Sequence, residues 1–96
     1  MGQVIWAPSA IADIEAIAEY IARDSVDSAS LVVAKVIEAT GRLERFPQSG
    51  RVIPEIGSPD CREIVVGNYR VMYRLESGDV WITGAIHGAT DWQPGF

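Results

Sequence analysis

The sequence predicts an α+β fold built from one strand, an antiparallel hairpin of two helices, and then a three-stranded antiparallel meander. Apolar residues recur at helical spacing through the first half of the chain. Alternating runs of β-branched and aromatic residues, separated by glycine-containing turns, fill much of the second half. We expect a single domain over residues 1–96, because a chain of 96 residues supports one hydrophobic core but not two.

The strongest local signal is the stretch 62–74, which has the pattern of a β-hairpin. Its two runs flank Gly67-Asn68, a pair suited to a two-residue turn whose first position favours glycine at positive φ. Such a turn sets the register, so that Val66 pairs with Tyr69 and Arg62 pairs with Tyr73. Alternate pairs then give a core face with Ile64, Val66, Tyr69, Val71 and Tyr73, and a second face with Glu63, Val65, Arg70, Met72 and Arg74.

The first half of the chain contains the other elements. A short strand is expected at Gln3–Trp6, although its place in the sheet does not follow from the sequence. Apolar spacing predicts one helix from Ser9 to about Arg23 and a second from about Ser28 to Arg45. The longest irregular segment follows, from Val52 to Cys61, with two prolines and a glycine.

A second turn at Ser77-Gly78 is expected to lead into a strand over Val80–His87. This turn pairs Leu75 with Val80 and, continuing without interruption, Met72 with Thr83. The core face then gains Val80, Ile82, Gly84 and Ile86, and the arginine-bearing face gains Trp81, Thr83, Ala85 and His87. The tail that follows contains Trp92 and Phe96, which suggest that it docks on the domain.

Composition restricts the possible functions. The net charge is −5, and acidic residues outnumber basic ones in both halves of the chain, so direct binding to nucleic acid is not expected. The single cysteine, Cys61, fits a reducing compartment, and no apolar run has the length of a membrane span, so we expect a cytoplasmic protein. One histidine and one cysteine give no metal-ligand spacing, and we expect neither a metal nor a cofactor.

Four segments, in this order and at this spacing, resemble the motifs of the ParE/RelE toxin superfamily. They are Ala10–Ile17 with Tyr20-Ile21, Leu43–Arg51, Arg62–Val66 with Tyr69–Arg74, and Ile86–Ala89. The resemblance covers nearly the whole chain and is closer to the ParE branch. Two departures stand out: Ala89-Thr90-Asp91 lacks the arginine that usually follows the His-Gly of ParE-like chains, and the RelE-type lysines and late tyrosine are missing.

The resemblance implies a RelE/ParE-like two-layer fold and the toxin half of a type II toxin–antitoxin pair, in a hetero-oligomer with a ParD-like or similar antitoxin. For the ParE branch it implies inhibition of DNA gyrase by protein binding, without enzymatic activity. For the RelE branch it would imply ribosome-dependent, metal-independent cleavage of mRNA. A relative that has lost toxicity and only binds its antitoxin is a third reading.

Candidate site residues follow from these alternatives. An endoribonuclease needs cations at the phosphate and proton carriers, for which the candidates are Arg62, Arg70, Arg74 and His87, with Glu55 or Glu63 as the second proton carrier. Cross-strand ion pairs between Glu63 and the arginines at 70 and 74, and stacking of Arg74 on Trp81, are the structural alternative. For a protein target, the candidate contacts are Arg51, Arg62, Arg70, Arg74, His87 and Trp92.

The antitoxin is expected to lay an extended or helical segment over exposed apolar surface. We predict that this groove lies beside the two-helix layer and an edge of the sheet, where unpaired strand groups are available.

Overall fold

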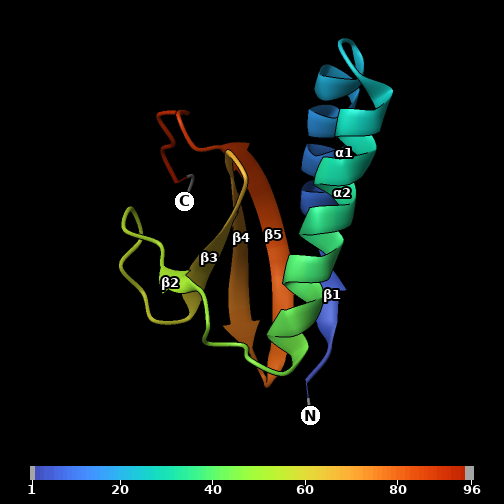
Figure 1. Cartoon of the computed structure of the whole chain (residues 1–96). Coiled ribbons are helices and arrows are strands. Elements are labelled where there is room, and N and C mark those ends of the chain that lie inside the picture. Colours follow the sequence, from blue (N-terminus) through green and yellow to red (C-terminus); the bar gives the residue numbers. More distant parts are fainter. Residues whose placement is uncertain (1, 95–96) are drawn as a thin grey trace.

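A computed structural model describes residues 2–94 as a two-layer α+β domain, with two helices packed on one face of a five-stranded mixed sheet (Figure 1). In chain order the elements are β1 (Val4–Trp6), α1 (Pro8–Ala22), α2 (Val26–Gly41), a 3-10 turn η1 (Arg42–Glu44), β2 (Arg51–Val52), β3 (Cys61–Val66), β4 (Tyr69–Glu76) and β5 (Asp79–His87). The strand order is β1-β5-β4-β3-β2. The predicted fold class is confirmed, and the meander forms the middle of the sheet.

The helices begin and end close to the predicted positions. Pro8 occupies the first turn of α1, where its missing N–H costs nothing. The Ser25 hydroxyl caps α2 by accepting the Ser28 N–H at 3.1 Å, so this helix starts two residues earlier than predicted. The expected continuation to Arg45 is wrong in its last turn, because α2 ends at Gly41 and the chain tightens into η1.

Two short strands complete the sheet beyond the meander. β1 lies parallel to the first half of β5, with Val4 opposite Val80, which places the strand that the sequence left unassigned. β2 was not predicted; it pairs antiparallel with β3 and sets Arg51 opposite Glu63. Two residues give too little alternation to be recognised in a sequence.

The register of the β3–β4 hairpin is confirmed for all its pairs, from Val66 with Tyr69 to Arg62 with Tyr73. Gly67 takes φ +59°, as the two-residue turn requires. The face assignment of this hairpin therefore holds, and Glu63, Arg70, Met72 and Arg74 lie on the sheet face opposite to Val71 and Tyr73.

The β4–β5 register is confirmed only as far as Tyr73 with Ile82. A bulge between Met72 and Tyr73 inserts Thr83, so Met72 pairs with Gly84 and not with Thr83. One extra residue reverses the faces of the rest of β5. Ala85 therefore lies in the core, Gly84 and Ile86 join the Met72 side, and His87 pairs with Tyr69 on the helix-covered side. The predicted placement of His87 on the same sheet face as Arg70 and Arg74 is wrong for this reason.

Helix α1 covers the part of β5 that β1 leaves unpaired. The Ser9 hydroxyl donates to the Thr83 carbonyl at 2.8 Å, and the Asp13 carboxylate accepts the Ala85 N–H at 3.0 Å. These two side chains are one helical turn apart on α1 and replace hydrogen bonds that a longer β1 would have made.

The core lies between the helices and the sheet. Its most buried large side chains come from the sheet, from α2 and from η1, namely Val36, Leu43, Val71, Tyr73 and Ile82. The opposite side of the sheet, which we call the open face, carries the irregular segment 53–60 and the C-terminal tail (Figure 1). Within residues 2–94, no helix is both long enough and apolar enough to cross a bilayer.

Candidate functional site

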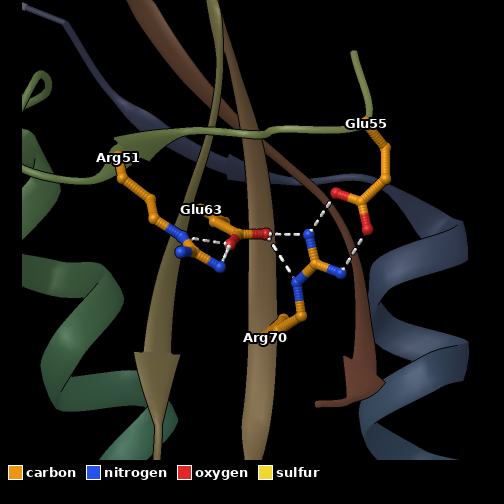
Figure 2. Close-up of polar contacts among 4 residues, drawn as sticks. All are labelled: Arg51, Glu55, Glu63 and Arg70. Carbon is orange, nitrogen blue, oxygen red and sulfur yellow. Dashed lines mark hydrogen bonds and ion pairs between the residues drawn. The ribbon is translucent and has the colours of Figure 1, made fainter. Parts of the chain in front are cut away.

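Four charged side chains form a row on the open face, with the sign of the charge alternating along it (Figure 2). We call Arg51, Glu63, Arg70 and Glu55 the charge row. Arg51 contacts one oxygen of Glu63 at 2.5 Å, and Arg70 Nε donates to the other at 2.7 Å. The two Nη atoms of Arg70 then donate to the two oxygens of Glu55 at 2.8 and 2.7 Å, which is a bidentate pair.

Strand register places three of these side chains. Arg51 and Glu63 are direct partners on β2 and β3, and Arg70 lies diagonal to Glu63 across the β3–β4 hairpin. Glu55 comes from the irregular segment between β2 and β3 and approaches from outside the sheet (Figure 2). Regular pairing therefore fixes three members of the row, and a loop supplies the fourth.

Burial along the charge row is uneven. The Glu63 side chain is 0% exposed and that of Arg70 is 10% exposed, whereas Glu55 keeps 31% and Arg51 keeps 61% of their side-chain area in solvent. A carboxylate without access to water needs close cationic partners, and Glu63 has two. No buried side-chain N or O atom in the part of the chain described by the structure lacks a hydrogen-bond partner.

The pairing shifts the pKa of two members of the row. The hydrogen bonds from Arg70 are the main cause that lowers the pKa of Glu55 to about 2. The same bonds, with those to Glu63, raise the pKa of Arg70. The pKa of Glu55 is lower in the folded state than in the unfolded chain. The ionised Glu55 carboxylate therefore contributes fully to the stability of the fold above the ordinary carboxyl pKa, and this contribution is lost as the pH falls towards 2.

The C-terminal tail adds an aromatic contact to Arg70. The Trp92 ring lies 5.8 Å from the Arg70 guanidinium carbon, within the range of a cation–π contact. Trp92, predicted as a partner contact, is therefore half-buried against its own domain. Phe96, the other predicted anchor of the tail, lies outside the described residues.

Beside Arg70 the open face contains a hollow of about 380 Å³, between the irregular segment and the tail. Met72, Gly84 and Ile86 form its floor, and Ile56 and Trp92 belong to its walls. A Cβ at Gly84 would lie 3.0 Å from an Asp13 carboxylate oxygen and 3.4 Å from the Met72 methyl group, so glycine permits these side chains to approach the strand closely. Ile86 reaches this hollow because of the bulge in β5. We refer to this cavity below as the hollow.

The other predicted arginines serve different parts of the domain. Arg62 lies on the opposite sheet face from Arg70 and donates to the carbonyls of Pro59 at 2.8 Å and Gly50 at 2.9 Å, which fixes two loops. Arg74 is half exposed and pairs with Glu76 at 2.9 Å, not with Glu63 as the structural alternative supposed. The two cation–π contacts found among residues 2–94 involve Arg23 and Arg70, so the predicted stacking of Arg74 on Trp81 does not form there.

His87 belongs to a separate, aromatic site. It packs edge-to-face on Tyr69, with ring centroids 5.4 Å apart, and its Nδ1 accepts the Ala89 N–H at 3.1 Å. Tyr20 of α1 lines the same depression on the helix side of the sheet. The sheet thus separates His87 from the charge row, and the arginine and histidine candidates do not converge on one point.

This arrangement favours recognition over proton-transfer chemistry. The guanidinium of Arg70 already has two carboxylate partners, and Glu55 and Glu63 are both engaged by arginines. No three His, Cys, Asp or Glu side chains within residues 2–94 are grouped as metal ligands. The sequence indicated the Glu63–Arg70 pair through the hairpin register, but gave no signal for the contacts that Glu55 and Trp92 make with Arg70.

Tyr73 makes a further set of polar contacts that the sequence did not reveal. Its hydroxyl accepts the Gly50 N–H at 2.9 Å and donates to the Pro47 carbonyl at 2.8 Å, which fastens the segment after η1 to the core side of the sheet. Burial is the main cause that raises the pKa of this phenol above 10. The aromatic ring was predicted as a core residue, but not the role of its hydroxyl.

The variant Tyr73→Phe tests this role. It leaves the buried Gly50 N–H without an acceptor, so the free energy of unfolding should fall by about 1–3 kcal/mol. The wild type should also lose stability as the pH rises above 10, because the unfolded chain ionises there while the folded phenol resists ionisation. Urea unfolding at pH 7 and pH 10.5 measures both effects. The variant should show a smaller alkaline loss, and an equal loss in the two proteins would contradict the pKa argument.

Sequence comparisons place the chain in a family of toxins. The sequence profile of the family described as "ParE toxin of type II toxin-antitoxin system, parDE" matches residues 4–92. Similar proteins include Toxin RelE2 of Caulobacter vibrioides, 32% identical over 93% of this chain and 98% of the relative, and Putative toxin Y4kP of Sinorhizobium fredii, 34% identical over 94% and 92%. The protein belongs to the ParE toxin family.

A solved structure supports the same fold. A chain described as "Chromosomal ParDE TA system from P. aeruginosa" superposes with a TM-score of 0.75, covering 91% of this chain and 96% of that one at 20% identity. The predicted RelE/ParE-like two-layer fold is confirmed.

Proposed function

We propose that this protein is the toxin of a type II toxin–antitoxin pair, that it acts in the cytoplasm by binding DNA gyrase, and that a cognate antitoxin neutralises it. Membership of the ParE family supports the toxin assignment. The observation that favours binding over catalysis is the separation of His87 from Arg70 by the sheet, together with the two carboxylates that already occupy Arg70. The free thiol of Cys61 is compatible with a reducing compartment.

Purified toxin should inhibit the supercoiling of relaxed plasmid by gyrase, or trap cleaved DNA, at micromolar concentration. Addition of the antitoxin should reverse the effect. Arg74 is a testable target contact, because its side chain is half exposed and its ion pair with Glu76 is solvated, so Arg74→Ala should change stability by less than about 1 kcal/mol. The matched control is Arg45→Ala, which removes an exposed arginine outside the predicted target contacts.

The expected result is weaker gyrase inhibition by Arg74→Ala and unchanged inhibition by Arg45→Ala. Wild-type toxin that leaves gyrase unaffected at micromolar concentration would contradict the gyrase target.

The RelE-like alternative predicts that transcripts are cut on ribosomes and that His87→Ala abolishes this cutting. The name of the Caulobacter relative is the reason to test this alternative. Intact mRNA in poisoned cells would eliminate this alternative. Normal growth of cells that express the chain alone would favour a non-toxic relative.

Two exposed apolar regions support the antitoxin-binding surface predicted beside the helices and the sheet edge. One is a groove of about 510 Å³ between α1 and α2, on their outer side. Val26 and Ile37 line this groove, and each of these residues is more than half exposed. The other, of about 580 Å³, lies between α2, η1 and the edge of β3, and includes the exposed Phe46 and Val65. We propose that the antitoxin covers one or both; a complex in which it touches neither would contradict this.

A further inference from the structure

Three members of the charge row are held by strand pairing, and the fourth is not. Arg51, Glu63 and Arg70 lie on paired strands, and two guanidinium cations facing one carboxylate leave a single positive charge. Glu55 supplies the balancing charge from the irregular segment between the strands. Three members of the row therefore form the site, and the fourth occupies it.

The contact between Glu55 and Arg70 has the geometry of ligand recognition. A planar guanidinium that donates two parallel N–H bonds matches a carboxylate from any source. Among residues 2–94, the hydrogen bonds of the Glu55 carboxylate to other side chains all go to Arg70. Because 31% of the Glu55 side chain is exposed, water and other solutes reach this end of the site.

Release of Glu55 does not require the neighbouring strands to separate. The irregular segment is anchored at Ile53, whose side chain is buried and whose N–H donates to the Cys61 carbonyl at 2.9 Å. Ile56 and Gly57 then fold back onto the Ile53 carbonyl. Glu55 lies between these anchors, so its side chain can leave Arg70 while β2 and β3 remain paired.

The present occupant indicates what a replacement would look like. Glu55 binds Arg70, and the next residue, Ile56, lines the hollow beside it. Trp92 contacts both parts, since it lies over the guanidinium and in the wall of the hollow. An acidic group next to an aliphatic group therefore fits the two halves of this surface.

We propose that the Arg70 guanidinium is a carboxylate-binding site that Glu55 fills from within the chain, and that an acidic residue followed by an aliphatic one, on a protein partner, replaces Glu55 at Arg70 and packs its aliphatic side chain into the hollow beside Ile56. The protein nature of the partner rests on the proposed function; the carboxylate site does not. A single excess positive charge balances one carboxylate, and the net charge of −5 disfavours a polyphosphate chain. An exchange of one carboxylate for another keeps both the charge and the number of hydrogen bonds.

The first experiment removes Glu55 and supplies a carboxylate in solution. In Glu55→Ala, sodium acetate should raise the thermal midpoint more than sodium chloride at equal ionic strength, and should shift the Arg70 Nε–H resonance saturably. The matched control is Glu76→Ala, which removes the carboxylate partner of the half-exposed Arg74. In that variant and in the wild type, the difference between acetate and chloride should be smaller and should rise without saturation, as expected for general salt exclusion.

An acetate response of Glu55→Ala no larger than that of Glu76→Ala, without saturation of the Arg70 Nε–H shift, would overturn the carboxylate site. Tighter binding of inorganic phosphate than of acetate would overturn the ligand class. If Glu55→Ala does not fold, Glu55→Gln keeps the shape of the side chain and removes its charge, and the same acetate titration of Arg70 Nε–H decides. These measurements use the isolated toxin, so a failed gyrase assay leaves their outcome unaffected.

The second experiment tests the predicted sequence of the partner. The capped dipeptide acetyl-Glu-Ile-amide should bind Glu55→Ala about tenfold or more tightly than acetyl-Gln-Ile-amide, because only the former restores a charged bidentate pair. It should also bind more tightly than acetyl-Glu-Gly-amide, which cannot fill the hollow. Equal binding of the three dipeptides would overturn the proposed recognition.

Discussion

Replacing Glu63 with alanine should lower the free energy of unfolding by about 3–5 kcal/mol, because the change removes the central carboxylate from a buried ionic network. Arg70 would keep only the partly solvated Glu55, and its Nε–H would be left facing an empty space inside the domain. A loss of this size is a large part of the total stability of a small domain, which is commonly about 5–15 kcal/mol.

Urea unfolding monitored by circular dichroism measures this loss. Glu76→Ala is again the matched control, since it breaks an ion pair that is half exposed on both sides and should cost less than about 1 kcal/mol. Similar losses in the two variants would show that burial does not strengthen the charge row. Glu63→Gln separates charge from shape: it retains an acceptor for Arg70 and should fall between the alanine variant and the wild type.

The sequence was sufficient to predict the part of the charge row that depends on local pairing. The turn at Gly67-Asn68 fixed the hairpin register, and the register placed Glu63 diagonal to Arg70. Nothing comparable specifies Glu55, because an irregular segment with prolines has no period from which a side-chain direction follows. Its approach to Arg70 results from tertiary packing, as does that of Trp92.

The bulge in β5 explains the main error of the sequence interpretation. The prediction assumed that side chains alternate between the two sheet faces along the whole of β5, including Thr83. In the structure Thr83 is an extra residue without a partner in β4, so every later residue of β5 lies on the face opposite to the predicted one. Gly84 was the available signal, since an isolated glycine within a strand often marks a bulge. The consequence is functional, because it moves His87 away from the arginines and weakens the nuclease reading.

The position of β1 and the existence of β2 could not be predicted from the local sequence pattern, for a different reason. β1 joins β5 in parallel, a pairing between residues far apart in the chain, and its edge position depends on α1 covering the remainder of β5 through Ser9 and Asp13. Such contacts depend on how the layers assemble, and short strands carry little pattern of their own.

The substitution Gly50→Ala should destabilise the protein at the upper end of the about 1–3 kcal/mol typical of overpacking. A Cβ at Gly50 would lie 2.5 Å from the Tyr73 hydroxyl and 2.6 Å from the Glu63 carbonyl oxygen. Neither atom can move freely, because the hydroxyl is held by the Pro47 carbonyl and the other atom belongs to the backbone of β3. The added methyl group would therefore push the segment before β2 away from the sheet.

Gly41→Ala is the matched control, since it makes the same chemical change where there is space. Gly41 has helical dihedral angles of −59° and −32°, and a Cβ there would have no atom from outside its own helical turn within 4 Å. We expect this variant to gain about 0.5–1 kcal/mol, because alanine loses less backbone entropy than glycine on entering a helix. Thermal unfolding is the measurement: the midpoint of Gly50→Ala should lie below that of the wild type, and the midpoint of Gly41→Ala should lie above it. A neutral Gly50→Ala would mean that Tyr73 does not pack against Gly50 in solution, and would remove the anchor that places Arg51 opposite Glu63.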